Sequence, residues 1–451
     1  MSSSYSERLH RVIPGGAHTY SRGDDQYPAN APEILVSGKG AFVTAADGRV
    51  LLDYGMGLRA VTLGYADERI NRAAMRGMEL GVNLTRASVL ELEAAEKMVA
   101  LAGADMVKFA KNGSNATTAA AKVARAFTGR RFICVPRQHP FFSFDDWFIG
   151  ATAIRRGIPE AHRATTLVFD YGDLASLQKL FTEHPGEIAG VMLEPATTVG
   201  PCDDAPGHDR LQPPTPEVAQ WPGNFLRQVQ DLCRREGSLF ILDEMITGFR
   251  WDLGGAQRLF GVRPDLSTFG KGMANGFAVA ALVGRREVME VGAIDKPGQE
   301  RTFLVSTTHG GEMASLAAFR ETVAIYEEQG VVRHLWDYGA RLLTGLEALA
   351  REAGVAQAFQ MQGNAVSMNY ATFDARGEPS LPLRTLFSQE MIRHGVLMPW
   401  IAQSFAHGPA ELERTLEAAR KALAVYAQAL EGGVERFLQG PAIKPVFRQF
   451  N

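Results

Sequence analysis

The sequence predicts an α/β protein in which a mostly parallel central sheet fills a large domain and a smaller α+β domain follows it. In the middle of the chain, short apolar or β-branched runs alternate with longer stretches of helical periodicity, which is typical of parallel strands wrapped by helices. After about Gly311 the periodicity becomes mainly helical. The chain has 451 residues, 46% of them hydrophobic, so it can bury a large core and form more than one domain.

Residues 1–60 are interpreted as an N-terminal arm. A helix followed by a loop is expected over 1–22, and short strands are expected over 41–54 around an Asp47-Gly48 turn. The large domain is expected over residues 61–311. Its predicted strands span 106–110, 132–136, 188–194, 238–243, 266–269 and 278–284, with helices such as 114–127 and 224–236 between them.

The smaller C-terminal α+β domain is expected over residues 312–451. Amphipathic stretches at 313–329, 332–353 and 410–430 predict its helices. Within the large domain, residues 201–223 carry six prolines, which predicts a long surface loop. Loops of that length in compact domains are often functional.

Composition and charge argue against several classes of protein. The net charge of −3 is spread without a basic stripe, so no nucleic-acid partner is expected. Cys134, Cys202 and Cys233 form no C-x-x-C pair, which favours a reducing cytoplasm over a disulfide framework or a zinc site. No signal sequence and no apolar stretch long enough to span a bilayer is recognisable, so neither export nor membrane insertion is expected.

The strongest chemical pattern joins an acid and a lysine at the ends of two predicted strands. Asp243 closes one apolar run, and Lys271 follows another 28 residues later. An acid at such an edge can keep a pyridine nitrogen protonated, and a lysine can form an imine with an aldehyde, as pyridoxal-phosphate chemistry requires. The alternative is that Asp243 caps a helix and Lys271 is a solvated loop lysine.

A second pattern is typical of phosphate binding. Gly113 and Ser114 stand where a predicted strand turns into an alanine-rich helix, and backbone N–H groups at a helix start bind phosphate well. The alternative is that Ser114 or Asn112 only caps this helix. Thr308, in a glycine-rich turn, offers a further hydroxyl. No H-E-x-x-H, G-x-S-x-G or Walker pattern occurs, and no metal site is predicted.

These motifs resemble the class III aminotransferases of pyridoxal-phosphate fold type I, near the glutamate-1-semialdehyde aminomutase group. The resemblance runs from Pro14-Gly15-Gly16 to Ser404-Phe405-Ala406-His407. Its most specific parts are Asp243-Glu244-Met245-Ile246-Thr247-Gly248-Phe249-Arg250 and Phe269-Gly270-Lys271-Gly272, which match the family in order and spacing.

The resemblance implies pyridoxal 5′-phosphate as the cofactor and assigns its contacts. Lys271 would form the internal aldimine and move the proton, and Asp243 would pair with the pyridine nitrogen. Gly113 and Ser114 would bind the phosphate. Thr308 would reach the phosphate in the neighbouring subunit, which implies a homodimer with two shared active sites.

The resemblance also points to substrate contacts. Alignment on Asp146-Trp147 puts Phe141 where the family stacks an aromatic ring on the cofactor, with Phe142 as the second choice. Glu194 would lie beside the substrate pocket. Arg22 falls where aminomutase-like members grip a substrate carboxylate, although it can equally be a surface residue of the arm. Arg59 is unusual at its position and is read as a second anion contact or as the partner of an acidic neighbour.

The predicted function is a transaminase that moves an amino group from a donor amine or amino acid to a carbonyl acceptor by a ping-pong mechanism. An intramolecular aminomutase and a racemase are the alternatives within this fold, and a homologue that has lost catalysis is a third. Four segments depart from the family: Gly57-Leu58-Arg59 replaces Ser-Trp-Gly, Phe141-Phe142-Ser143 replaces Tyr-His-Gly, the proline-rich loop after Glu194 is longer than the family norm, and residues 398–403 lack the acidic stretch of true aminomutases.

Overall fold

The computed structural model describes residues 4–451 and folds into two compact units. Unit 1 joins the chain up to Asp67 with Arg333–Arg448, and unit 2 comprises Glu68–Val332 with Gln449–Asn451. This division differs from the predicted boundaries at residues 60 and 311. Two sets of contacts that are distant in sequence explain the difference, and each is described below with its unit.

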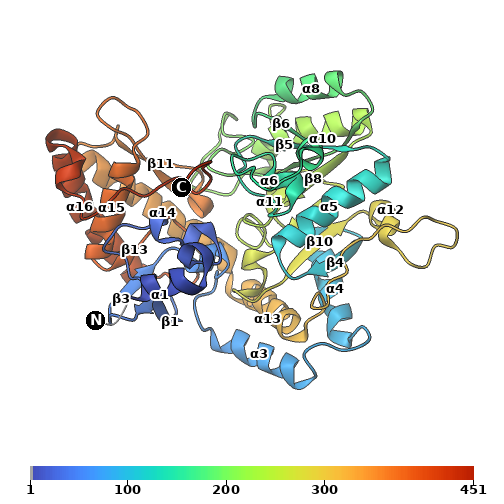
Figure 1. Cartoon of the computed structure of the whole chain (residues 1–451), viewed down its shortest axis with the longest axis horizontal. Coiled ribbons are helices and arrows are strands. Elements are labelled where there is room, and N and C mark those ends of the chain that lie inside the picture. The colour runs from blue at the N-terminus through green and yellow to red at the C-terminus, as the bar shows by residue number, and fades with distance from the viewer. Residues whose placement is uncertain (1–3) are drawn as a thin grey trace. The chain divides into compact units, whose positions relative to one another are not determined.

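Unit 2 is built on a seven-stranded sheet in the order β4-β10-β9-β8-β7-β5-β6 (Figure 1). Neighbouring strands from β9 to β6 run parallel, whereas β10 runs antiparallel to both β4 and β9. The predicted α/β class with a mostly parallel sheet is therefore confirmed. The strands are β4 (Met106–Ala110), β5 (Phe132–Pro136), β6 (Thr166–Phe169), β7 (Ile188–Leu193), β8 (Leu239–Asp243), β9 (Leu266–Phe269) and β10 (Ala280–Gly284).

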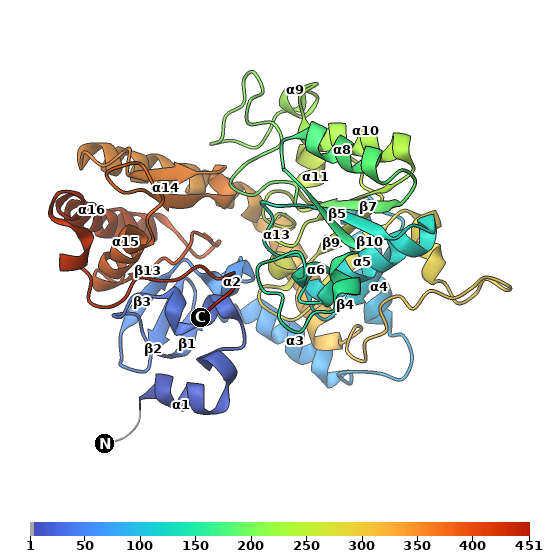
Figure 2. The same cartoon turned by 45° about the horizontal axis from the view of Figure 1, so that its top comes forward.

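Helices cover both faces of this sheet (Figure 2). The face toward α5 (Gly113–Thr128) carries alternate strand residues such as Ile133, Leu239 and Ile241, which pack on buried alanines of that helix. The intervening residues point to the opposite face, where α8 and α10 lie. The other helices of unit 2 are α3 (Glu68–Glu79), α4 (Val89–Ala102), α6 (Asp146–Ile149), α7 (Glu160–Arg163), α8 (Leu174–Glu183), α9 (Pro216–Ala219), α10 (Phe225–Glu236), α11 (Ala256–Leu259), α12 (Arg286–Met289) and α13 (Met313–Gln329).

Helix α13 belongs to unit 2, although the sequence placed it in the C-terminal domain. It packs along α3 and α4 and also contacts the short 3-10 turn Lys271–Ala274. The chain leaves unit 2 only inside the following helix, α14 (Val331–Glu352). Helical periodicity locates α13 correctly but does not reveal which neighbours its apolar face meets.

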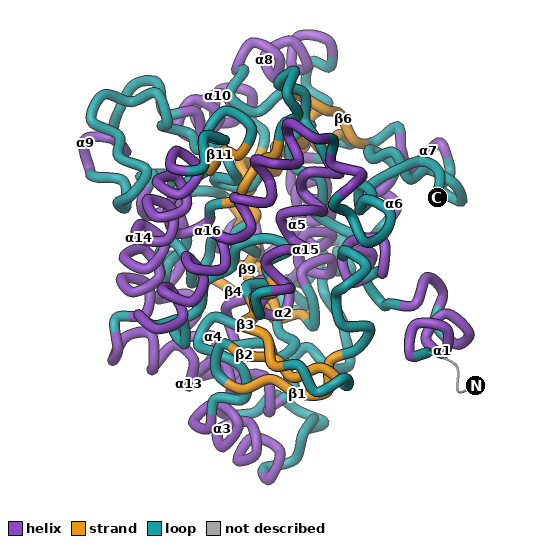
Figure 3. Tube along the Cα trace, turned by 90° about the vertical axis from the view of Figure 1, so that its left-hand side faces the viewer, coloured by secondary structure: helices purple, strands orange, loops and turns teal. Residues whose placement is uncertain are grey.

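Unit 1 combines the two ends of the chain, and Figure 3 labels its strands β1, β2 and β3 and its helices α15 and α16. β13 (Val396–Leu397) pairs in parallel with β3 (Val50–Asp53), which is why the predicted arm folds together with the C-terminal segment. α15 packs against α16, and α1 begins at its capping residue Ser4. The remaining elements are α1 (Tyr5–Val12), β1 (Leu35–Lys39), β2 (Phe42–Ala45), α2 (Met56–Arg59), β11 (Phe359–Gln362), β12 (Asn369–Thr372), α15 (Leu381–Arg393) and α16 (Pro409–Gly432).

The expected turn at Asp47-Gly48 joins β2 to β3, and Gly48 has a φ of 86°. The part of the expected first helix that falls on residues 1–3 lies outside the described residues. Over residues 4–451, no helix has both the length and the apolar composition needed to cross a bilayer.

Candidate active site

Three residues with the predicted chemistry follow neighbouring strands of unit 2. β8 ends at Asp243, and β9, its parallel neighbour, leads through Gly270 to Lys271. β7 lies on the other side of β8 and is followed directly by Glu194. Because parallel strands end at the same edge of a sheet, these residues emerge together where open α/β sheets bind ligands.

Asp243 is a buried acid held in one orientation. Its Oδ1 atom accepts hydrogen bonds from the backbone N–H of Met245 (3.0 Å) and from the hydroxyl of Thr268 (2.9 Å). Burial raises the pKa of Asp243 to about 6, although these hydrogen bonds and the charge of Lys271 favour the carboxylate. Such a group gains from a cation placed against it, because the cation offsets the cost of keeping a carboxylate out of water.

Lys271 stands in a backbone conformation that side chains seldom adopt. Its φ is 45°, in the left-handed region, and it opens a single 3-10 turn. Such a residue costs on the order of 1 kcal/mol and is found preferentially at functional sites. The strain therefore favours a functional lysine over the alternative of a solvated loop lysine.

Two glycines bring the lysine turn and the start of α5 against the same side chain. A Cβ atom on Gly113 would lie 2.9 Å from the Sδ atom of Met245, and one on Gly270 would lie 2.6 Å from it. A side chain at either glycine would therefore require the Met245 side chain to move. The two motifs are far apart in the sequence, but both approach Met245, the residue that follows Asp243-Glu244.

At the start of α5, one residue caps the helix and other groups remain available to bind an anion. The side chain of Asn112 caps the helix by accepting from the backbone N–H of Asn115 at 3.0 Å. Ser114 is buried, and its Oγ accepts from the backbone N–H of Phe144 at 3.1 Å, which leaves its own hydroxyl hydrogen available to donate. Of the two predicted caps, the structure uses Asn112 as the N-cap.

The two aromatic candidates for ring stacking differ in exposure. Phe142 is buried in the core of unit 2 and meets Phe148 edge-on, at 5.3 Å between ring centroids. Phe141 is 44% exposed and also meets Phe148 edge-on, at 6.3 Å. Only Phe141 of this pair retains an accessible ring face, so Phe142 is unsuited to the stacking role that the sequence gave it as second choice.

The structure adds two residues that sequence reasoning missed. His139 follows β5, and its Nδ1 atom accepts from the backbone N–H of Glu194 at 3.0 Å. Tyr171 follows β6 and donates its hydroxyl to the backbone carbonyl of Pro195 at 2.7 Å. Both therefore hold the backbone beside Glu194, and only the sheet order β7-β5-β6 brings them there.

Thr308 lies on an exposed turn of unit 2. Its backbone carbonyl accepts a hydrogen bond from the side-chain amide of Asn83 at 2.8 Å, which ties this turn to the segment between α3 and α4. The backbone N–H of Met313 bonds to the carbonyl of Val82 at 3.0 Å and ties the same two segments together again. The side chain of Thr308 is thus presented from a fixed surface position.

The two predicted arginines, Arg22 and Arg59, belong to unit 1. Arg22 is exposed at the end of a 3-10 turn, Tyr20–Arg22. Arg59 ends α2, whose four residues are all left-handed, with φ between 40° and 68°. Each non-glycine residue in this conformation costs about 1–2 kcal/mol, so the turn needs support.

A buried network supplies this support. The carboxylate of Asp53 accepts from the backbone N–H groups of Gly55 (2.7 Å) and Met56 (2.9 Å) and from the hydroxyl of Tyr65 (2.6 Å). The indole N–H of Trp400 donates to the carbonyl of Gly55 at 3.2 Å. The network holds α2 in its unfavourable conformation and so fixes the backbone that carries Arg59.

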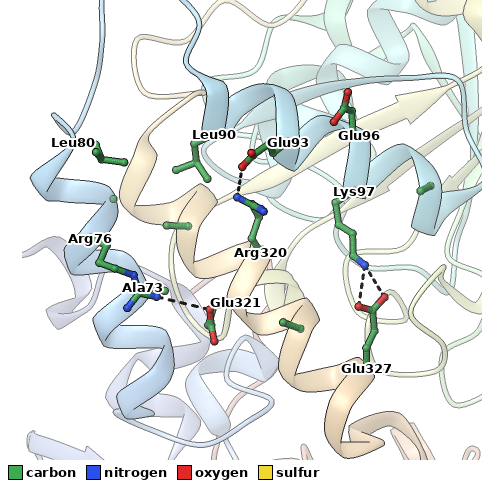
Figure 4. Close-up of a pocket in the computed structure, with 14 residues that line it drawn as sticks. Ala73, Arg76, Leu80, Leu90, Glu93, Glu96, Lys97, Arg320, Glu321 and Glu327 are labelled. Atoms are coloured by element: carbon green, nitrogen blue, oxygen red, sulfur yellow. Dashed lines mark hydrogen bonds and ion pairs between the residues drawn. The ribbon is translucent and has the colours of Figure 1, made fainter.

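A separate pocket of about 820 Å³ lies between α3, α4 and α13 (Figure 4). None of the predicted site residues lines it. Six of its charged side chains form three pairs: Arg320 with Glu93, Lys97 with Glu327 (2.7 Å) and Arg76 with Glu321 (3.9 Å). Across residues 4–451, the acidic, histidine and cysteine side chains form no group of three that could hold a metal ion.

Comparison with known proteins adds independent information. The family model for class-III aminotransferases matches residues 24–165 and 216–401. The glutamate-1-semialdehyde 2,1-aminomutase of Thermus thermophilus is 30% identical over 94% of this chain and 99% of its own. The 3-aminobutyryl-CoA aminotransferase of Cloacimonas acidaminovorans is 32% identical over 94% and 96%. The FumI protein of Sphingopyxis sp. MTA144, solved in its PLP internal aldimine form, superposes with a TM-score of 0.82 at 27% identity over 95% and 97%.

Proposed function

The chain belongs to the class-III aminotransferase family, whose cofactor is pyridoxal 5′-phosphate, and we propose that Lys271 and Asp243 are the residues with which it moves amino groups. The observation that carries this proposal is the meeting of Gly113, Asp243 and Gly270-Lys271 around Met245 at one edge of the sheet. The reaction proposed is transfer from a donor amine or amino acid to a carbonyl acceptor in two half-reactions.

The residues at this edge suit the cofactor in charge and in shape. The glycines at 113 and 270 let the start of α5 and the lysine turn pack closely on Met245, and the hydroxyl of Ser114 and the N–H groups at the start of α5 suit a phosphate. When bound, pyridoxal phosphate supplies an aldehyde that condenses with amines and a ring that withdraws electrons from the adjacent carbon. The strained lysine supplies the amine and the buried acid supplies the charge.

Each residue has one task in this proposal. Lys271 would hold the cofactor through its Nζ atom and, once the donor amine has taken that place, would move a proton with the same atom. Asp243 holds a proton on the ring nitrogen through its carboxylate. Gly113 and Ser114 bind the phosphate, and Phe141 packs on the ring face.

The proposed substrate contacts are Glu194, Arg22 and Arg59. A guanidinium group binds a carboxylate through two parallel hydrogen bonds, which favours carboxylate-bearing substrates. Arg59 has a left-handed backbone conformation (φ 68°), which costs an arginine more free energy than a glycine. We therefore infer that the arginine side chain makes a contact that offsets this cost.

Replacing Arg59 by glycine tests this role. We expect KM for carboxylate-bearing donors to rise about tenfold or more, while KM for neutral amines stays within about twofold. The melting temperature should not fall, because glycine relieves the left-handed strain. Steady-state kinetics and thermal unfolding measure the two effects, with Arg59→Lys as the variant that keeps the charge. A lower melting temperature with equal changes for both substrate types would make Arg59 a structural residue.

We also propose a homodimer in which Thr308 reaches the phosphate in the partner's site. Segment 75–92, which Asn83 ties to the Thr308 turn, exposes several large apolar side chains, among them Leu80 (66%), Val89 (72%) and Leu92 (59%). Clustered apolar exposure of this kind is typical of interaction surfaces. The proposed compartment is the cytoplasm, in keeping with three unpaired cysteines.

An intramolecular aminomutase is the second candidate, because a relative with 30% identity carries that activity. The two are separated by titrating the pyridoxal-phosphate form with a panel of amines and amino acids. A transaminase loses the visible absorbance of the lysine-bound cofactor and releases a keto acid or aldehyde from the donor. An aminomutase or racemase releases none, and a protein that never acquires the absorbance contradicts the proposal.

A further inference from the structure

The proline-rich loop at residues 201–223 forms one wall of a pocket that the proposed reaction does not use. The pocket has a volume of about 500 Å³, a size typical of small-molecule sites. None of the residues proposed above for the cofactor or the substrate lines it. The lining residues include Pro214, Pro216 and Ala219 from the loop and α9, Arg227 from α10, and Arg258 and Leu259 from α11.

A fully buried asparagine holds the three walls of this pocket together. The side-chain nitrogen of Asn224 donates to the backbone carbonyls of Ala219 at 2.8 Å and of Phe260 at 2.9 Å. Its side-chain oxygen accepts from the backbone N–H groups of Leu226 at 3.1 Å and of Arg227 at 3.4 Å, and so caps α10. The walls are therefore fixed before any ligand arrives, and these N–H groups are already in use.

The charged residues that line the pocket are both arginines, and no acidic residue lines it. Arg258 is 59% exposed and pairs with Asp252 at 3.2 Å. Arg227 is half-buried, and its guanidinium group forms neither a hydrogen bond nor an ion pair within residues 4–451. Its charge lies in the first turn of α10, where the helix dipole disfavours a cation. Neither an ion pair nor helix stability therefore accounts for this arginine.

The pocket between α3, α4 and α13 shows the contrasting arrangement. There, the three ion pairs described above join cations and acids of the same lining. Such a lining neutralises its own charges, whereas the lining that contains Arg227 and Arg258 leaves a positive charge without a partner. A ligand of opposite charge would supply the missing partner.

The common family pattern does not account for the loop wall of the pocket. Residues 166–215 lie outside both segments that match the class-III family model, and they include most of the proline-rich loop. Pro214 belongs to this unmatched part, and Pro216 follows it directly on α9. The loop therefore adds a wall to the family fold at the place where Arg227 has no protein partner.

We propose that this pocket binds a phosphate group carried by a small molecule with an apolar body, and that Arg227 is its main contact. A guanidinium group binds phosphate through two parallel hydrogen bonds and stays charged over the whole physiological pH range. Arg258 adds a second contact, which is weaker because Asp252 shares its charge. Pro214, Pro216 and Leu259 offer apolar surface to the body of the ligand.

Phenyl phosphate is a suitable probe, because it joins a phosphate to a small apolar ring. The full-length protein is first saturated with pyridoxal 5′-phosphate, so that the groups that bind the cofactor's phosphate are occupied. Isothermal titration calorimetry should then give a Kd below about 1 mM. Inorganic phosphate, which lacks the ring, should bind about tenfold more weakly, and phenol, which lacks the phosphate, should show no binding at about 10 mM.

Three substitutions locate the binding in this pocket. Arg227→Gln should raise the Kd of phenyl phosphate about tenfold or more without lowering the melting temperature, because it removes an unpaired charge from the first turn of α10. Arg258→Gln should raise this Kd about threefold. Arg235→Gln is the matched control: it removes the same charge from the exposed last turn of α10, outside the pocket, and should keep the Kd within about twofold.

Wild-type affinity for phenyl phosphate in Arg227→Gln would overturn the proposal, because the probe would then bind elsewhere, for example at the proposed substrate arginines. Equal losses in Arg227→Gln and Arg235→Gln would also overturn it, as would equal binding of phenol or no binding by the wild-type holoenzyme at about 10 mM. If inorganic phosphate binds as tightly as phenyl phosphate and Arg227→Gln weakens both, the site is confirmed with free phosphate as its ligand.

Discussion

Replacing Lys271 by alanine is expected to reduce kcat by about 10⁴-fold, the largest effect of any single substitution in this chain. The variant loses both the amine that holds the cofactor and the group that moves the proton, and positioned acid–base groups alone contribute about 10²- to 10⁴-fold. The cofactor should still bind through Asp243, Gly113 and Ser114, but without the absorbance of a lysine-bound form. Stopped-flow absorbance and product analysis measure these effects.

The fold of the Lys271→Ala variant should be unchanged. Alanine and lysine have a similar conformational free-energy cost at a φ of 45°, so the melting temperature of the cofactor-free protein should stay close to that of the wild type. Lys179→Ala, on the exposed side of α8, is the matched control and should keep full activity, because its side chain is 73% exposed and pairs with Glu183 at 3.7 Å. Full turnover by Lys271→Ala would remove Lys271 from the chemistry.

Local patterns were sufficient to predict several strands of the large sheet, among them the continuously buried β5 and β9. The expected ranges 106–110, 132–136 and 266–269 coincide with β4, β5 and β9. β6, by contrast, is an edge strand, Thr166–Phe169, whose two middle residues are only half-buried, so it lacks the continuous burial of β9. The two-residue strand β13 exists only because it pairs with β3, more than 300 residues earlier, and no local signal carries such a pairing.

The same limit applies to the candidate site. Asp243, Lys271 and the start of α5 could be predicted because each stands at the end of a recognisable strand. The close packing of Gly113 and Gly270 on Met245 depends on tertiary contacts that spacing does not encode. The left-handed turn at Met56–Arg59 also escaped prediction, because three of its four residues are not glycine and its stability comes from Asp53, Tyr65 and Trp400.

Replacing Asp243 by asparagine is expected to reduce kcat by about 10²- to 10³-fold, because the ring nitrogen loses the charge that keeps it protonated. The fold should tolerate the change, since an amide oxygen can accept the hydrogen bonds from Met245 and Thr268 that Oδ1 accepts now. Steady-state kinetics measure the loss. Unchanged kcat would show that the ring nitrogen does not need this carboxylate.

The raised pKa of Asp243 also predicts how cofactor binding changes stability with pH. Between the ordinary value of 3.8 and about 6, the cofactor-free folded protein keeps a proton that the unfolded chain has released. Its stability therefore falls as pH rises through this range, by up to about 3 kcal/mol, because one pKa unit corresponds to about 1.4 kcal/mol. A protonated ring nitrogen beside the carboxylate removes this penalty. Stabilisation by the bound cofactor should accordingly grow from pH 4 to above pH 6.

Pyridoxamine 5′-phosphate is the appropriate probe, because it forms no imine with Lys271 and the titration of such an imine therefore does not contribute. The rise in melting temperature that it causes should increase with pH in the wild type and be smaller and nearly independent of pH in Asp243→Asn. Glu244→Gln is the control: Glu244 is also buried, with a pKa raised to about 7, but its carboxylate caps Ala256 and Gln257. The Glu244→Gln variant should keep the pH dependence. If Asp243→Asn shows the same dependence as the wild type, a group other than Asp243 causes it.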